Sequence, residues 1–146
     1  MEKARVAIGR DLRVAPGSLS SSASVANSGF PQCAFGARVG GRGVVVVVED
    51  DVEPDAYAVL ERTIDEAAQI FPVRLSAAPM HVAHLGLDAS WFPEEGHLET
   101  TDGVRLVIAT VSWPRAPLGR RIALAVAAAR TYLGRLEPKL ARGPAP

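Results

Sequence analysis

Gly43-Val44-Val45-Val46-Val47-Val48-Glu49 is the stretch that decides the fold. Five consecutive valines favour a β-strand, because β-branched side chains fit the pleated surface of a sheet. The run has no polar alternation, which predicts that both faces of the strand are covered. The segment 32–38 is also strand-like, and the glycines of Val39-Gly40-Gly41-Arg42 between the two runs predict a β-hairpin.

Apolar residues at helical spacing predict a helix over 54–70 and a long C-terminal helix that ends at Pro138. Pro54 suits the first turn of the former, and Pro72 ends it. The two apolar stripes are Tyr57, Leu60, Ile64, Ala67 and Phe71 in the first helix, and Ile122, Ala125, Val126, Ala129, Leu133 and Leu136 in the second. A short helix is expected over 2–9, with Gly9 as its terminator.

Further short strands are expected at 12–14, 89–92, 97–101 and 104–113, with a tight turn at Asp102-Gly103. The Ser-rich segment 18–29 indicates a flexible loop, and residues 139–146 form a tail. Prolines and Gly86 interrupt the segment 72–87, for which no regular structure is assigned beyond an extended Val73-Arg74-Leu75.

The resulting order is α-β-loop-ββα-βββα in one domain that spans 1–146. It predicts an α+β fold: a curled antiparallel β-sheet with two helices packed on one face. Two helices leave a second apolar face, which we expect to line a groove or cavity. A curled sheet, a second subunit or a ligand would cover it.

Composition and charge limit which partners and which cellular compartment are expected. Sixteen Lys and Arg balance sixteen Asp and Glu, so no nucleic-acid partner is expected. The sequence contains no run of 18 apolar residues, so membrane insertion is not expected. The N-terminal residues do not have the pattern of a signal peptide. We expect a cytoplasmic protein if Met1 is the native start, and otherwise a cell-envelope protein whose leader was removed. Cys33 is the single cysteine and is expected to be a small buried hydrophobe.

The sequence contains no phosphate-binding loop and no Gly-x-Ser-x-Gly nucleophile elbow, and it predicts no cofactor. His81, His84 and His97 could bind zinc, but the short spacing of the first two lacks the full ligand set of such a site, so no metal is expected. Carboxylates cluster around Asp50-Asp51 and Glu94-Glu95, where they suit a helix start and a solvated turn. Either cluster holds a general acid only if one of its carboxyls is buried.

Aromatic residues near strand ends suggest a ligand pocket. Trp91 and Trp113 both lie beside loops and prolines, where a tryptophan lines a pocket mouth or packs in the core. The full set of candidate pocket residues is Trp91, Trp113, Tyr57, Met80, Phe92 and His84.

Three segments, in order, carry a family resemblance: Ile8-Gly9-Arg10-Asp11-Leu12, Gln32-Cys33-Ala34-Phe35 and His84-Leu85-Gly86-Leu87-Asp88-Ala89-Ser90-Trp91. With them the chain resembles the small actinobacterial lipoproteins that include LpqN and, more distantly, the extracellular sensor domain of the kinase PknH. The resemblance implies a sheet-and-helix domain with an open groove that binds ligands or partners at the cell envelope. Such proteins also carry a lipidated leader and a second cysteine that pairs with the one matching Cys33, and this sequence has neither.

These observations favour a domain that binds a small hydrophobic molecule in an apolar groove or cavity. The alternative is a cofactor-independent cyclase or isomerase of natural-product (polyketide) biosynthesis, which guides a cycloaddition through pocket shape. A third hypothesis is an interaction protein that forms a homodimer through the second sheet face.

Overall fold

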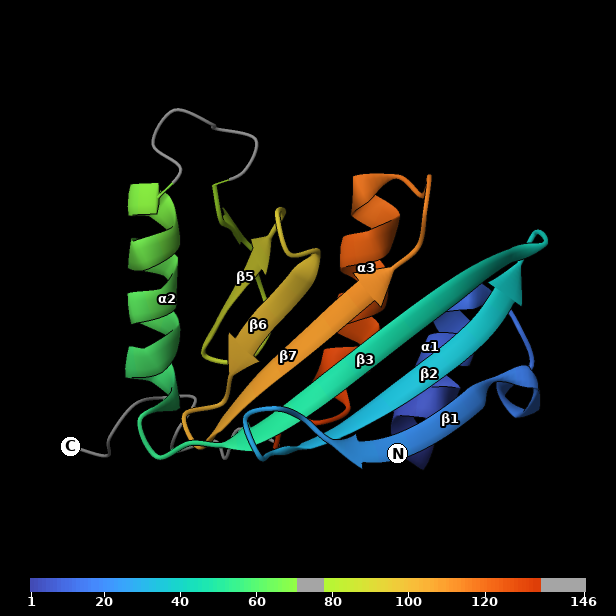
Figure 1. The fold of residues 1–146 in the computed structure, drawn as a ribbon, viewed down its shortest axis with the longest axis horizontal. Coiled ribbons are helices and arrows are strands. Elements are labelled where there is room, and N and C mark those ends of the chain that lie inside the picture. The colour runs from blue at the N-terminus through green and yellow to red at the C-terminus, as the bar shows by residue number, and fades with distance from the viewer. Residues whose placement is uncertain (71–77, 135–146) are drawn as a thin grey trace.

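The valine-rich segment forms β3 (Arg42–Val52), which lies between β2 (Pro31–Val39) and β7 (Arg105–Ser112) in a seven-stranded antiparallel sheet. The computed structural model describes residues 1–70 and 78–134 (Figure 1). The sheet has the order β1-β2-β3-β7-β6-β5-β4. Its remaining strands are β1 (Ser20–Val25), β4 (Met80–His81), β5 (Asp88–Phe92) and β6 (His97–Thr101).

Three helices accompany the curled sheet: α1 (Glu2–Leu12), α2 (Ala56–Ile70) and α3 (Leu118–Arg130). A single 3₁₀ turn, η1 (Pro16–Ser18), joins α1 to β1. The α+β class and the curled antiparallel sheet are therefore confirmed. Among the described residues, no helix is long and apolar enough to cross a membrane.

The larger core lies between one face of the sheet and the two helices α1 and α3, which run behind the sheet in Figure 1. Because side chains alternate along a strand, Val44, Val46 and Val48 share this face. Ala109 and Val111 of β7 pair with Val48 and Val46. The helices contribute small residues that allow close approach, namely Ala4, Ala125, Ala128 and Ala129. Two helices on one face thus form the main core, as predicted.

The second face is covered at one end by α2, which packs against β5, β6 and β7. Its contact is a small cluster that includes Leu60, Phe92 and Leu106. The coverage is incomplete, because Val45 of β3 remains 43% exposed. The expectation that both faces of the valine strand are covered is therefore wrong at Val45. The pair of helices that shares a face is α1 and α3, rather than the two longer predicted helices.

Two local predictions are corrected. The expected loop at 18–29 contains β1, which pairs with β2 from Ser20 opposite Gly36 to Val25 opposite Pro31. Serine hydroxyls are tolerated because β1 is an edge strand with exposed side chains. The expected strand at 12–14 is also absent, because α1 continues to Leu12 and ends at Arg13 in the left-handed conformation.

Gly9 lies inside α1 and does not terminate it. The absence of a side chain at Gly9 allows close packing, because a Cβ at this position would lie 3.1 Å from the carbonyl oxygen of Val14. The last helix is shorter than predicted, because α3 ends at Arg130 and Leu133 lies beyond it, and β3 extends to Val52. The remaining predicted strands and the helix over 54–70 match the structure within about two residues at each boundary. Phe71, Pro72 and Val73-Arg74-Leu75, together with Leu136, Pro138 and the expected tail, lie outside the described residues.

Candidate functional site

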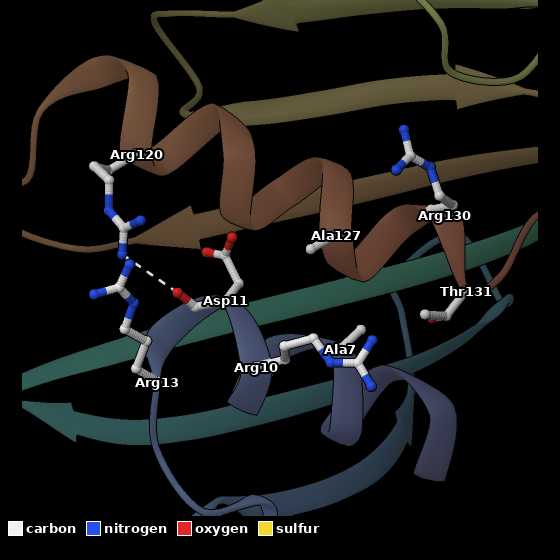
Figure 2. Close-up of a pocket in the computed structure, with 8 residues that line it drawn as sticks. All are labelled: Ala7, Arg10, Asp11, Arg13, Arg120, Ala127, Arg130 and Thr131. Atoms are coloured by element: carbon white, nitrogen blue, oxygen red, sulfur yellow. Dashed lines mark hydrogen bonds between the residues drawn. The ribbon is translucent and has the colours of Figure 1, made fainter.

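A groove of about 540 Å³ lies on the solvent side of α1 and α3 (Figure 2). It is open to solvent. Its lining residues are Ala7, Arg10, Asp11, Arg13, Arg120, Ala127, Arg130 and Thr131. Four of these eight residues are arginines, which makes charge the dominant property of the groove.

Helical periodicity places these side chains. In α1, Ala4, Ile8 and Leu12 face the core, so residues 7, 10 and 11 lie toward the rim. In α3, the alanine- and leucine-rich stripe 124, 125, 128 and 129 is buried, so residues 120, 127 and 130 face outward. The two helices pack through small side chains, and the arginines surround the line along which they meet.

Main-chain and ring contacts hold two of the arginines. The Arg120 guanidinium donates a hydrogen bond from Nη2 to the main-chain carbonyl oxygen of Asp11, at 3.3 Å. Its guanidinium carbon also lies 5.5 Å from the centre of the Trp113 ring, a cation–π geometry. Arg130 donates to the carbonyl oxygen of His84 at 3.4 Å. These contacts orient the guanidinium groups without neutralising their charge.

Arg13 follows α1 with a φ of 59°, a left-handed conformation that is uncommon for a residue with a side chain. In Figure 2 the side chains of Arg13 and Arg120 point toward one another from the end of α1 and the start of α3. Two guanidinium groups that converge are favoured by an anion between them, because like charges otherwise repel.

Among the described residues that line the groove, Asp11 is the only acidic one. Within residues 1–70 and 78–134, none of the four arginines forms an ion pair with it or with another carboxylate. The groove therefore concentrates positive charge in a chain whose formal net charge is zero. Guanidinium groups present a planar fork of N–H donors that matches carboxylate and phosphate oxygens.

A second pocket of about 340 Å³ continues the groove along α1 toward the N-terminus. It shares Ala7, Arg10 and Thr131 with the first pocket, and it adds Glu2, Lys3 and Val6. Val6 is 37% exposed. The combined surface thus has a strongly cationic end near Arg13 and a more apolar stretch beside Ala7 and Val6.

The structure does not gather the six predicted pocket residues into one site. Trp91 and Phe92 are neighbours in β5 and point to opposite sheet faces, where each is buried in a different core cluster. Tyr57 on α2 and Met80 on β4 are exposed, and Met80 pairs with Trp91. The remaining two residues, Trp113 and His84, contact groove arginines.

Sequence reasoning missed the arginines themselves. Arg120 and Arg130 are exposed on the water-facing side of the last helix, away from its buried stripe. Their meeting with Arg10 and Arg13 depends on the packing of α1 against α3, which no local pattern specifies. The available signal was the position of Arg10 and Arg13 around the first helix terminus, in the segment Arg10-Asp11-Leu12-Arg13.

The three histidines lie apart along the second half of the sheet. The Nδ1 of His81 is 3.7 Å from Asp88, and the Nε2 of His97 is 3.2 Å from Glu99. His84 is exposed in a left-handed turn. In the described part of the chain, no group of three His, Cys, Asp or Glu side chains is arranged to hold a metal ion.

Buried carboxyls occur at the far end of β3. Asp51 is buried, and this burial together with neighbouring Glu49 raises its pKa to about 7. Burial also raises the pKa of Asp50, although the Arg105 guanidinium lies 2.6 Å from its carboxylate and opposes the shift. Asp51 and Glu99 are therefore buried carboxyls of the kind that a general acid requires, but neither lines the arginine groove.

Tyr132 lies beside Cys33 below the end of α3. Burial and the adjacent thiol raise the pKa of the Tyr132 phenol above its ordinary value. Cys33 packs against the main core but is only half-buried, less than the expected burial. A neutral phenol in this position suits packing rather than proton transfer.

No family model, curated protein or solved structure matches the chain. The resemblance to the actinobacterial lipoproteins therefore stays a prediction. The fold and the groove together define a small α+β domain with a cationic surface groove, and the function rests on that geometry.

Proposed function

We propose that this protein is a binding domain for a small molecule that carries an anionic group, and that the group is held in the groove between α1 and α3. The observation that carries the proposal is the set of four arginines, Arg10, Arg13, Arg120 and Arg130, which share the groove with one carboxylate among its described lining residues. Focused positive potential of this kind raises the local concentration of anions.

The surface around the groove supports a molecule with an apolar portion as well. Ala7 and Ala127 lie between the arginines, and the adjoining pocket adds the exposed side chain of Val6. An amphipathic ligand would place its anionic end near Arg13 and Arg120 and its apolar end along α1. This proposal retains the small-molecule ligand expected from the sequence and adds an anionic end to it.

The purely hydrophobic ligand, the cyclase and the homodimer stay predictions. A cyclase that works by pocket shape needs a site that surrounds its substrate. The two pockets along α1 are open to solvent, so they favour reversible binding of one end of a molecule.

The test is titration with inorganic phosphate and with propionate at low ionic strength, monitored by NMR chemical shifts of backbone amides. Binding should move resonances of α1 and α3. The Arg13→Gln/Arg120→Gln double variant should lose affinity by about tenfold or more, since each charge-assisted hydrogen bond is worth roughly 1.5–3 kcal/mol.

A charge-matched control is available on other elements. Arg42 in β3 and Arg62 in α2 are exposed, and neither lines this groove. The Arg42→Gln/Arg62→Gln variant has the same net charge as the groove variant and should bind both probes within about twofold of wild type. Equal losses in the two variants would mean that only overall charge attracts the anions, and the proposal would be wrong.

A further inference from the structure

The carboxylate of Asp11 is unusual among the groove side chains. It lies on the last turn of α1, and Figure 2 shows it pointing across the groove toward α3. Its Oδ2 atom is buried, and no described residue donates a hydrogen bond to it. A carboxylate oxygen without a donor is unfavourable, so rotation of the Asp11 side chain toward a donor on a bound molecule would be favourable.

The groove arginines do not fill this role. Arg120, which is close enough to contact Asp11, uses its Nη2 on the main-chain carbonyl and lies over Trp113. Arg13 and Arg120 point toward one another, and neither forms an ion pair with the Asp11 carboxylate in the described structure. The groove therefore offers two complementary features side by side: converging N–H donors and one unsatisfied acceptor.

A negative charge inside an anion site is costly for a plain anion, because it repels the group that the arginines attract. The cost becomes a gain when the ligand carries a hydroxyl or ammonium donor near its anionic group. That donor satisfies Oδ2 while the anionic group binds the guanidinium groups. An acceptor placed in this way selects against analogues that lack the donor.

We infer that Asp11 is a specificity residue, and that the groove takes small anions with a neighbouring hydrogen-bond donor, such as 2-hydroxy or 2-amino carboxylates. This inference rests on the proposed anion-binding function of the groove. The hydroxyl and the ammonium share the same chemistry toward Asp11, and the probes below distinguish them.

The experiment compares three probes of similar size: propionate, lactate, which adds a hydroxyl, and alanine, which adds an ammonium. Wild-type protein should bind lactate or alanine about tenfold more tightly than propionate, the ratio that corresponds to one hydrogen bond to a charged group. A preference for lactate alone identifies a hydroxyl, and a preference for alanine alone identifies an ammonium.

The Asp11→Ala variant separates specificity from general binding. Arg120 contacts the main-chain oxygen of residue 11, so the substitution leaves that hydrogen bond in place. The variant should bind propionate more tightly than wild type, because a repelling charge is gone, and its preference for lactate or alanine should vanish. Retained propionate binding also reports that the variant is folded.

The outcomes distinguish the two claims. Loss of propionate binding in Arg13→Gln/Arg120→Gln, with equal affinities for all three probes in wild type, would retain the anion site and overturn the role of Asp11. A donor preference that survives in Asp11→Ala would also overturn it. Propionate binding that is unaffected by the arginine substitutions would reject the groove itself.

Discussion

Arg120 and Trp113 are in contact at the edge of the groove, with 5.5 Å between the guanidinium carbon and the centre of the indole ring. At an exposed site such a pair contributes about 0.5–1 kcal/mol. Its greater consequence is optical, because the indole is adjacent to a cation that a bound anion would engage. The other tryptophan, Trp91, is fully buried in the core.

The first prediction is that phosphate or lactate changes the intrinsic fluorescence of the protein through Trp113. Anion binding at Arg120 alters the charge above the indole ring, whereas Trp91 has no contact with solvent. Trp113→Phe should abolish the response while amide shifts still report binding. A response that persists in Trp113→Phe would assign it to Trp91 and to a change within the core.

Asp51 gives the protein a predicted pH dependence. The pKa of its carboxyl is about 7 in the folded protein because of burial and Glu49, compared with 3.8 ordinarily. Between about pH 4 and pH 7 the folded state holds a proton that the unfolded state has released. The contribution of Asp51 to stability is therefore most favourable at low pH and is lost as pH rises through this window.

Asp51→Asn imitates the protonated carboxyl at every pH. We expect it to raise the free energy of unfolding at pH 8 by on the order of 1–3 kcal/mol, and to change it little near pH 4. Denaturant unfolding at both pH values measures the effect. Exposed Asp55→Asn is the control and should follow the wild-type pH profile. A constant difference between Asp51→Asn and wild type at all pH values would rule out titration as the cause.

Gly86 provides a prediction about the backbone. Its φ is 59°, and a Cβ would lie 2.4 Å from the carbonyl oxygen of Thr101, a rigid neighbour. Gly86→Ala should therefore lower the free energy of unfolding by about 2 kcal/mol or more. Gly17→Ala is the control, since no atom lies within 4 Å of its added Cβ, and it should change stability by about 0.5 kcal/mol or less. Similar losses in the two variants would contradict the steric argument.

The sequence predicts the sheet well where apolar patterning is strong. Strands β3, β6 and β7 have long or bounded β-branched runs, and Gly40-Gly41 and Asp102-Gly103 have the turn chemistry that joins hairpins. β1 was missed because its serines are typical of loops, and the strand forms by pairing with β2. Tertiary pairing of this kind overrides local preference.

The site was harder to predict than the fold for a physical reason. Aromatic residues suggested a pocket, but adjacent positions in a strand point to opposite faces, so Trp91 and Phe92 enter separate cores. The arginines of the groove lie more than a hundred positions apart in the chain, at residues 13 and 120. Only the packing of α1 on α3 brings them together.

The last prediction concerns the independence of the two sheet faces. Phe92 holds α2 to the second face through a small cluster with Leu60 and Leu106, and its ring lies 5.2 Å from that of His97. Phe92→Leu should weaken packing at that cluster and lower the free energy of unfolding by about 1–2 kcal/mol. It should lower hydrogen-exchange protection mainly in α2. The α1–α3 core lies on the other face, so phosphate binding should be unchanged. An equal loss of protection in α1 and α3 would contradict the prediction. It would show that the helices on both faces of the sheet unfold together as one unit.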